Sequence, residues 1–223
     1  MKKDLTEIVF ILDRSGSMSG LEADTIGGFN SMITKQQKEP GEALISTVLF
    51  DDRTQVLHDR VNLADIKPIS DKEYYVQGCT ALLDAVGGAI DHIRAAQKQM
   101  PDDERPEKTL FIITTDGMEN SSRKYSLDKV RKMIDKRKKK NQWEFLFLGA
   151  NIDAIEVADR FGIAPSRAVN WHHDKAGTAL NFKVMSKVVG CARASGSAGS
   201  MSDALDEDML EEIREDYAKR PGK

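Results

Sequence analysis

The sequence lacks the features that would place it in a membrane, in a disulfide-rich scaffold or on a nucleic acid. It has only two cysteines, Cys79 and Cys191, which lie far apart without the close spacing of a redox motif or a zinc site. No apolar run approaches the length needed to span a bilayer, and the first four residues lead into a strand-like segment instead of a signal peptide. The formal net charge of −3 gives no general reason to expect a nucleic acid. We therefore expect a cytoplasmic protein with reduced thiols, and neither nucleic acid nor membrane as its partner.

The sequence also lacks the motifs of several large enzyme families. It contains no Gly-x-x-x-x-Gly-Lys-Ser/Thr phosphate loop and no Gly-x-Ser-x-Gly nucleophile elbow. With 223 residues, of which 40% are hydrophobic and 31% charged, the chain is long enough for one large domain with a sizeable core. A globular domain without an evident nucleophile is what remains.

A strand followed by a polar turn stands near the start of the chain. Residues 8–12 form an unbroken apolar run, which is typical of a strand buried on both faces of a parallel sheet. Asp13, Ser15 and Ser17 follow at alternate positions, and in a tight turn such side chains can point into one concavity. Hard oxygen donors without His or Cys favour Mg²⁺, Mn²⁺ or Ca²⁺. An ordinary polar turn is the alternative, since a D-x-S-x-S pattern arises by chance in about one chain in twenty of this size.

Strand-like and helix-like segments alternate along most of the chain. We expect strands at 8–12, 43–50, 54–57, 109–115, 143–148 and 168–171, and helices at 22–33, 80–98, 126–134, 154–161 and 178–192. Only three residues separate the second strand from the third, so these two must pair antiparallel. The pattern predicts an α/β fold with a doubly wound, mostly parallel sheet, one antiparallel strand and helices on both faces. In such sheets ligands bind beyond the carboxyl ends of the strands.

Two more polar residues are expected at this carboxyl edge. Asp116 follows the fourth predicted strand and repeats the sequence of strand, carboxylate and turn that Asp13 begins. Thr80 stands where the N-cap of the second helix is expected, with its hydroxyl free of the helix interior. Gly27 and Gly28 would weaken an isolated helix, which suggests that the first helix lies very close to the sheet.

Together these segments resemble the von Willebrand factor A (vWA) domain family. The segments that match its metal-ion-dependent adhesion site (MIDAS), written D-x-S-x-S, T and D, are Asp13-Arg14-Ser15-Gly16-Ser17-Met18, Gly78-Cys79-Thr80 and Thr115-Asp116-Gly117. The resemblance covers about residues 7–192 and implies a Rossmann-like fold. It also implies a Mg²⁺ ion held by Ser15, Ser17 and Thr80, with Asp13 and Asp116 close by or bonded through water. Arg14 stands where many adhesion-type members carry Gly, which leaves every ligand intact and resembles the bacterial intracellular branch.

The function expected from this resemblance is that of a protein-interaction module and not of an enzyme. Hydroxyl ligands neutralise none of the charge of a Mg²⁺ ion, so the ion can accept a Glu or Asp carboxylate from a partner protein. Mn²⁺ or Ca²⁺ could replace Mg²⁺. The alternative is a Mg²⁺-dependent phosphoryl-group hydrolase, since a metal alone can activate water. Phosphohydrolases whose first strand ends in D-x-D-x-T use a second carboxylate as acid/base, and here Ser15 takes its place.

Three other polar segments have ordinary interpretations. The basic run from Lys136 to Lys140 is interpreted as a solvated helix end and not as a nucleic-acid site. Adjacent histidines usually diverge, so His172 and His173 are expected in a polar loop and not as ligands of a transition metal. The pair at 51–52 either shapes the potential of the site or caps a turn.

The composition divides the chain into a vWA domain at 1–194, a flexible linker at 195–202 and an acidic amphipathic helix at 203–223. The linker is rich in Ser, Gly and Ala. Beyond it, Leu205, Met209, Ile213 and Tyr217 repeat every four residues, and between 203 and 216 eight acids stand against one base. Such a helix could pack on its own domain, or its carboxylates could reach the metal site of its own or a second copy, a route to self-association.

Overall fold

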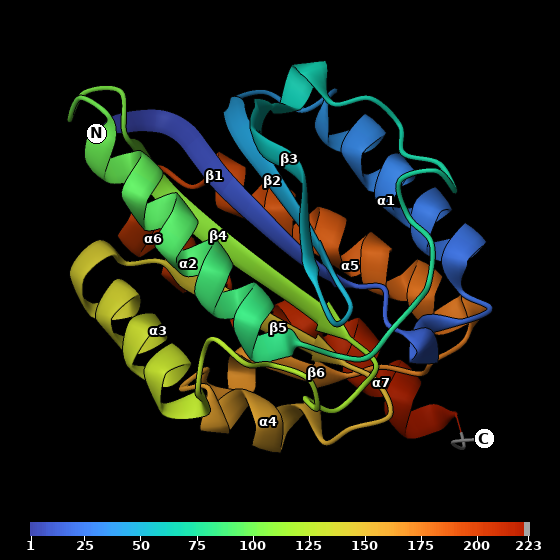
Figure 1. Cartoon of the computed structure of the whole chain (residues 1–223). Helices are drawn as coiled ribbons and strands as arrows, with labels where there is room; N and C mark the ends of the chain where they lie inside the picture. Colours follow the sequence, from blue (N-terminus) through green and yellow to red (C-terminus); the bar gives the residue numbers. More distant parts are fainter. Residues whose placement is uncertain (221–223) are drawn as a thin grey trace.

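The computed structural model describes residues 1–220, which form a six-stranded sheet between two layers of helices (Figure 1). The strands are β1 (Lys2–Asp13), β2 (Glu42–Phe50), β3 (Thr54–Asn62), β4 (Pro106–Thr115), β5 (Glu144–Gly149) and β6 (Ala168–Asn170). Their order is β3-β2-β1-β4-β5-β6, and every neighbouring pair is parallel except β2 and β3. The predicted fold class, a mostly parallel α/β sheet with one antiparallel strand, is confirmed.

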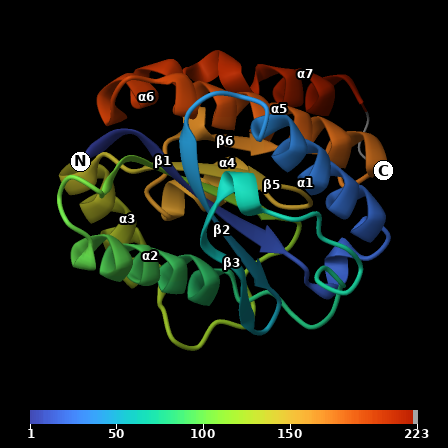
Figure 2. The ribbon, with the colours of Figure 1, turned by 90° about the horizontal axis from the view of Figure 1, so that it is seen from above.

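The helices cover both faces of the sheet (Figure 2). One face carries α1 (Glu22–Gln36), α5 (Lys175–Ala194), α6 (Ala198–Ala204) and α7 (Glu211–Lys219), and the other α2 (Leu82–Gln99), α3 (Leu127–Asn141) and α4 (Ala154–Arg160). Short 3-10 helices occur at η1 (Gly16–Met18), η2 (Leu63–Asp65), η3 (Pro165–Arg167) and η4 (Glu207–Leu210). Within residues 1–220, no helix is both long and apolar enough to cross a membrane.

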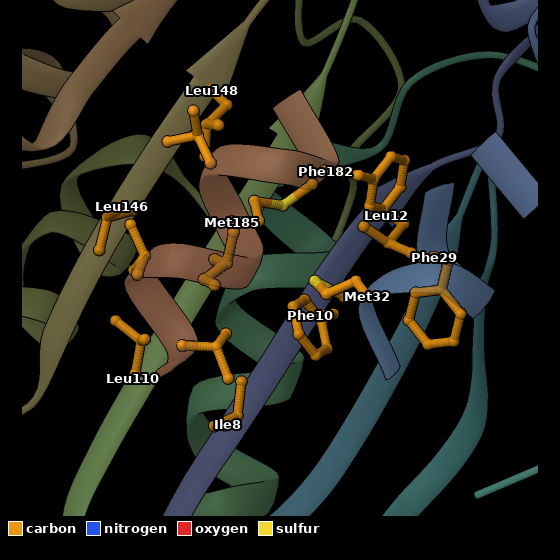
Figure 3. Close-up of a cluster of buried hydrophobic side chains, with 14 of the residues drawn as sticks. Ile8, Phe10, Leu12, Phe29, Met32, Leu110, Leu146, Leu148, Phe182 and Met185 are labelled. Carbon is orange, nitrogen blue, oxygen red and sulfur yellow. The ribbon is translucent and has the colours of Figure 1, made fainter. Parts of the chain in front are cut away.

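Strand β1 contributes to two separate apolar cores. Phe10 and Leu12 point toward α1 and α5, where they meet residues such as Met185 (Figure 3). Val9 and Ile11 point the other way, toward α2 and α3. Because helices cover both faces of this central strand, all four positions must be apolar, and this explains the unbroken run in the sequence.

Gly28 in α1 allows a close contact with another helix and not, as expected, with the sheet. A Cβ atom at Gly28 would lie 2.3 Å from Cδ2 of Phe182, whereas one at Gly27 would meet nothing within 4 Å. Gly28 therefore allows α1 to approach α5, and the expectation of a close approach to the sheet was wrong. The sequence could not distinguish these partners because both lie on the same face.

The C-terminal segment departs from the prediction of a flexible linker followed by one helix. Helix α6 occupies residues 198–204, and its first turn is held by a capping box in which the side chains of Ser197 and Ser200 bond each other's backbone N–H. Met201 and Leu205 are buried in the core. These contacts override the flexibility that the composition suggests.

The acidic segment that follows is built from η4 and α7 instead of a single helix. Leu210 and Ile213 are buried on the side of α5, so the apolar stripe packs on its own chain. The last part of the predicted helix, 221–223, lies outside the described residues. That residues 1–194 form a domain of their own stays a prediction.

Candidate metal centre

The five predicted site residues lie on three loops at the carboxyl edge of the sheet. Asp13, Ser15 and Ser17 follow β1, Thr80 precedes α2, and Asp116 follows β4. Leu12 pairs with Thr114 across β1 and β4, so the residues after these strands leave the sheet side by side. The structure brings all three loops together.

Backbone hydrogen bonds join the loops to one another. The Gly16 N–H donates to the Gly78 carbonyl oxygen at 3.1 Å, which joins the first loop to the second. Asn120 joins the second to the third, since its N–H donates to the Thr80 carbonyl at 3.0 Å and its side-chain Oδ1 accepts from the Thr80 N–H at 3.0 Å. The polar side chains therefore converge on a frame that is already hydrogen-bonded.

Hydroxyl groups converge at the centre of this frame. Ser15 Oγ and Ser17 Oγ lie 3.0 Å apart, and Ser17 Oγ donates to Asp116 Oδ1 at 2.6 Å. A Cβ atom at Gly117 would lie 3.0 Å from Thr80 Oγ1 and 3.3 Å from Ser17 Oγ. Both hydroxyls thus border the same small space, which a side chain at position 117 would fill.

Asp13 fixes the first loop with both of its carboxylate oxygens. Oδ1 accepts from the Ser15 N–H at 2.7 Å, and Oδ2 accepts from Thr115 Oγ1 at 2.5 Å. Burial raises the pKa of Asp13, and the nearby Asp116 carboxylate raises it further, while the bonds from Ser15 and Thr115 oppose this rise. Asp13 is a buried negative charge whose repulsion from Asp116 a cation would relieve.

Asp116 has an oxygen with no hydrogen bond of its own. Oδ2 is buried and lacks a hydrogen-bond partner among the described residues, although Nε2 of His173 lies 2.9 Å away. The distance suits an ion pair. The closeness of the Asp116 carboxylate raises the pKa of His173 against the opposing effect of burial.

His173 is the site residue that the sequence analysis missed. The prediction that adjacent histidines diverge is confirmed, because His172 turns away and stacks on Tyr217 with 4.7 Å between ring centroids. His173 nevertheless reaches the carboxyl edge, since it follows β6 in a parallel sheet. The position of the last predicted strand was the signal that could have found it.

Thr80 does not cap α2. The helix begins at Leu82 with Ala81 at the N-cap position, and Thr80 is buried in the preceding loop. The predicted N-cap role was wrong because Asn120, forty residues away in the chain, fixes the Thr80 backbone instead. The expected consequence still holds, since the hydroxyl is not used by the helix.

Arg14 points away from the converging hydroxyls. Its Nε donates to Oδ2 of buried Asp51 at 2.9 Å, and its Nη1 donates to Gln55 Oε1 at 2.7 Å. Asp51 also accepts from the Arg53 N–H at 2.7 Å, so it caps the β2–β3 turn. The ion pair between Arg14 and Asp51 therefore joins the loop after β1 to the β2–β3 turn, next to the site.

The donor set fits a hard divalent cation. In an octahedral Mg²⁺ site with Mg–O bonds of about 2.1 Å, adjacent oxygens are about 3 Å apart, and Ser15 Oγ and Ser17 Oγ are separated by 3.0 Å. The unbonded Asp116 Oδ2 and the repulsion between Asp13 and Asp116 also favour a cation. No three His, Cys, Asp or Glu side chains gather as a metal site anywhere in residues 1–220, so a cation here would depend on the hydroxyls.

Comparison with solved structures places the fold among vWA domains. Proximal thread matrix protein 1 from the mussel byssus, in a structure with a zinc-occupied MIDAS motif, has 19% identity and a TM-score of 0.58, covering 83% of this chain and 46% of its own. The von Willebrand factor type A protein from Catenulispora acidiphila has 16% identity and a TM-score of 0.54, covering 88% and 42%. Manganese-loaded TRAP from Plasmodium vivax has 17% identity and a TM-score of 0.52, covering 82% and 74%.

These similarities show a vWA-like fold and no more, because the identities are low. The chain spans less than half the length of the mussel and Catenulispora chains that it matches. No protein-family model matches the sequence, and no curated protein matches it either.

Proposed function

We propose that this protein is a divalent-metal-dependent interaction module that binds an acidic side chain of a partner protein. The observation that carries the proposal is the convergence of the Ser17 and Thr80 hydroxyls beside Asp116, whose Oδ2 has no hydrogen bond. Ser15 and the buried Asp13 complete the set.

In this proposal Ser15, Ser17 and Thr80 offer neutral hydroxyl ligands, and Asp13 and Asp116 supply the negative charge. Mg²⁺ is the expected ion, with Mn²⁺ or Ca²⁺ as substitutes, and when bound it would supply an electrophilic centre for an external carboxylate. The zinc ion in the MIDAS motif of the mussel protein supports a divalent ion in this kind of site, and the Plasmodium protein is described as manganese-loaded.

A protein partner is favoured over a small acid by the surface beside the site. Gly117 and Met118 line an apolar hollow of about 200 Å³ that also includes Leu83 and Phe161. Met118 is 69% exposed. An apolar hollow beside a charged site offers a partner protein a surface to bury around its acidic side chain.

A cytoplasmic location, and membership of the bacterial intracellular branch, are part of the proposal. Both cysteines are unpaired in the structure, which suits a reducing compartment. Self-association through the acidic tail stays a prediction. The tail packs on α5 of its own chain, and Glu212 pairs there with Lys183 and Lys187.

Metal titration tests the site itself. Calorimetry should show one Mg²⁺ or Mn²⁺ per chain, and Ser15→Ala or Thr80→Ala should remove this binding. Ser19→Ala is the matched control, because Ser19 is an exposed serine of the same turn outside the converging set. Equal binding in the wild type and the first two variants would place the ion elsewhere.

Partner capture tests the function. The full chain, immobilised with Mg²⁺ or with EDTA, should retain a bacterial protein only in the presence of Mg²⁺, and excess free glutamate should weaken the capture. Capture that persists in EDTA and in Asp116→Ala would contradict the proposal.

His173 favours a second candidate function, the Mg²⁺-dependent phosphoryl-group hydrolase. An imidazole 2.9 Å from Asp116 could transfer a proton beside a metal-activated water. The binding module remains the better supported, because no nucleophile accompanies the histidine. Mg²⁺-dependent hydrolysis of p-nitrophenyl phosphate that His173→Gln abolishes would establish the hydrolase instead.

A further inference from the structure

A second polar cleft lies at the amino edge of the sheet, opposite the candidate metal centre. It is formed where the ends of α2 and α3, which lie side by side on one face (Figure 2), meet the starts of β4 and β5. Its volume is about 220 Å³, and it is lined by Arg94, Gln97, Lys98, Arg105, Arg137, Asn141 and Trp143. Four of these side chains are cationic and none is acidic.

Two arginines from different helices, Arg94 of α2 and Arg137 of α3, line this cleft. Arg137 donates from Nη1 to Asn141 Oδ1 at 3.0 Å, and its guanidinium lies 5.8 Å from the centre of the Trp143 ring. Burial lowers the pKa of Arg137, and the positive charge of Arg94 lowers it further. Arg94 and Arg137 therefore bring two positive charges to the same cleft.

The acidic residues around the cleft leave this positive charge only partly balanced. Asp91 lies 3.5 Å from Arg94, and Asp102 lies 2.9 Å from Arg105, but Asp91 is only partly buried, Asp102 is exposed, and both lie outside the lining. Exposed pairs of this kind contribute little. Glu7, which accepts from Gln97 behind the cleft, is already paired with Arg60.

The size and walls of the cleft limit what it can hold. A volume of about 220 Å³ is below the roughly 300 Å³ at which pockets for drug-sized ligands begin. Trp143 is buried, stacked on Phe111 on one side with Arg137 on the other, so no face of its ring is free for a nucleobase. Planar guanidinium groups match the geometry of a phosphate group.

We propose that this cleft is a binding site for a phosphate monoester group, held by Arg94, Arg137 and Lys98. The group could belong to a small phosphorylated molecule or to a phosphorylated residue of a protein, since both present the same dianion. The site is separate from the metal centre, because the two lie at opposite edges of the sheet.

The two tryptophans provide the test, because each marks one edge of the sheet. Trp143 lines the cleft, and Trp171 lies near His173 at the metal centre, with 6.1 Å between their ring centroids. Phosphate, a sugar phosphate and a glycine-flanked phosphoserine peptide are titrated into ¹⁵N-labelled protein in EDTA. The Trp143 indole N–H signal should move and that of Trp171 should not. Tighter binding of the sugar phosphate would identify a small phosphorylated molecule as the ligand, and tighter binding of the peptide would identify a phosphorylated protein.

Paired charge variants make the test specific. Arg94→Gln with Arg137→Gln should weaken binding at least about tenfold. Lys139→Gln with Lys140→Gln, which removes two charges from the exposed end of α3 outside the cleft, should leave it within about twofold. If the arginine variant is unfolded, Lys98→Gln serves instead, because Lys98 is an exposed residue at the edge of the cleft.

Three results would overturn the proposal. The first is a Trp143 signal that does not move at 10 mM phosphate, about the concentration at which a site of millimolar affinity saturates. The second is equal weakening of phosphate binding by the two pairs of variants. The third is tighter binding of a DNA duplex than of phosphate, if that binding depends on Lys139 and Lys140. None of them bears on the proposed metal site, since the titration contains no metal.

Discussion

Glu7 and Lys108 at the amino edge of the sheet are satisfied by the protein itself, whereas Asp116 at the carboxyl edge is not. Glu7 is fully buried on β1, where it pairs with Arg60 and accepts from Gln97 Nε2 at 2.6 Å. Lys108 donates to two backbone carbonyl oxygens at the end of α5. Asp116 is just as buried, yet its Oδ2 accepts no hydrogen bond within the described part of the chain.

The difference separates charges that hold the fold together from charges that await a ligand. A buried charge that is only partly paired is costly, so a bound cation would stabilise it. Oδ1 of Asp116 accepts from the Ser17 hydroxyl, and Oδ2 has beside it the imidazole of His173, which is a cation only when it is protonated. Substitutions at the two edges should therefore affect different properties.

The largest effect is expected from Glu7→Gln. The change leaves Arg60 without its carboxylate in a buried setting, and breaking one side of a buried ion pair costs about 3–5 kcal/mol of the free energy of unfolding. Urea unfolding measures the loss. Metal affinity, measured by calorimetry on the same variant, should not change.

Glu42→Gln is the matched control for this prediction. Glu42 pairs with Lys2 on the surface of the neighbouring strand at 2.7 Å, with both side chains about half exposed. Its loss should cost about 1 kcal/mol or less. Equal losses in the two variants would mean that burial of Glu7 does not matter, and the contrast between the edges would fail.

Asp116→Asn should have the opposite effect, changing metal binding and leaving the stability of the metal-free protein nearly unchanged. Without metal at pH 9, where the His173 contact contributes almost nothing, the free energy of unfolding should stay the same or rise slightly, because the repulsion between Asp116 and buried Asp13 disappears. With Mg²⁺ at a hundred times its dissociation constant, the wild type should gain about 2.7 kcal/mol and the variant nothing. Thermal melts with Mg²⁺ and with EDTA measure both numbers. A large loss of stability in EDTA would show that Asp116 is a structural charge like Glu7.

The sequence was sufficient for the strands and for the placement of most polar residues at the carboxyl edge. A strand buried on both faces leaves an unbroken apolar run, as β1 does, and parallel strands end at the same edge of the sheet. Asp13 and Asp116 could therefore be placed together from their positions after two such runs. Their binding of a metal stays a prediction.

What the sequence could not show depends on contacts between distant segments. The loop of Thr80 is fixed by Asn120, and five elements of the fold separate His173 from Asp116 in the sequence. Helix α6 is ordered by the burial of Met201 as much as by its own capping box. Such effects arise only once the sheet is assembled, because local composition carries no record of them.

Gly117→Ala should weaken metal binding by roughly 30-fold. The added methyl group would press on Thr80 Oγ1 at 3.0 Å and Ser17 Oγ at 3.3 Å, and overpacking of this kind costs about 2 kcal/mol. Gly88→Ala is the control, since a Cβ atom there meets nothing within 4 Å. That substitution lies inside α2 and should slightly stabilise the helix without changing metal affinity. Unchanged metal affinity in Gly117→Ala would mean that the ion does not sit between these hydroxyls.

The smallest effect is expected from a substitution of His173. It measures how much the ion pair between His173 and Asp116 stabilises the fold without metal. The closeness of Asp116 raises the pKa of His173 in the folded protein. The folded state therefore holds the proton more tightly than the unfolded chain, and the stabilisation is fully present below the ordinary histidine pKa of about 6.5. It disappears as the pH rises through the raised value.

We expect His173→Gln to lower the free energy of unfolding by up to about 1 kcal/mol at pH 6 and by almost nothing at pH 9, both in EDTA. His172→Gln is the control, and His58, whose pKa is lowered by burial, contributes equally to both variants and cancels in their difference. A loss at pH 6 far above 1 kcal/mol would show that His173 satisfies Asp116 as fully as Arg60 satisfies Glu7. In that case the two edges would differ less than the unbonded oxygen suggests, and a metal ion would have to compete with an internal cation for the site.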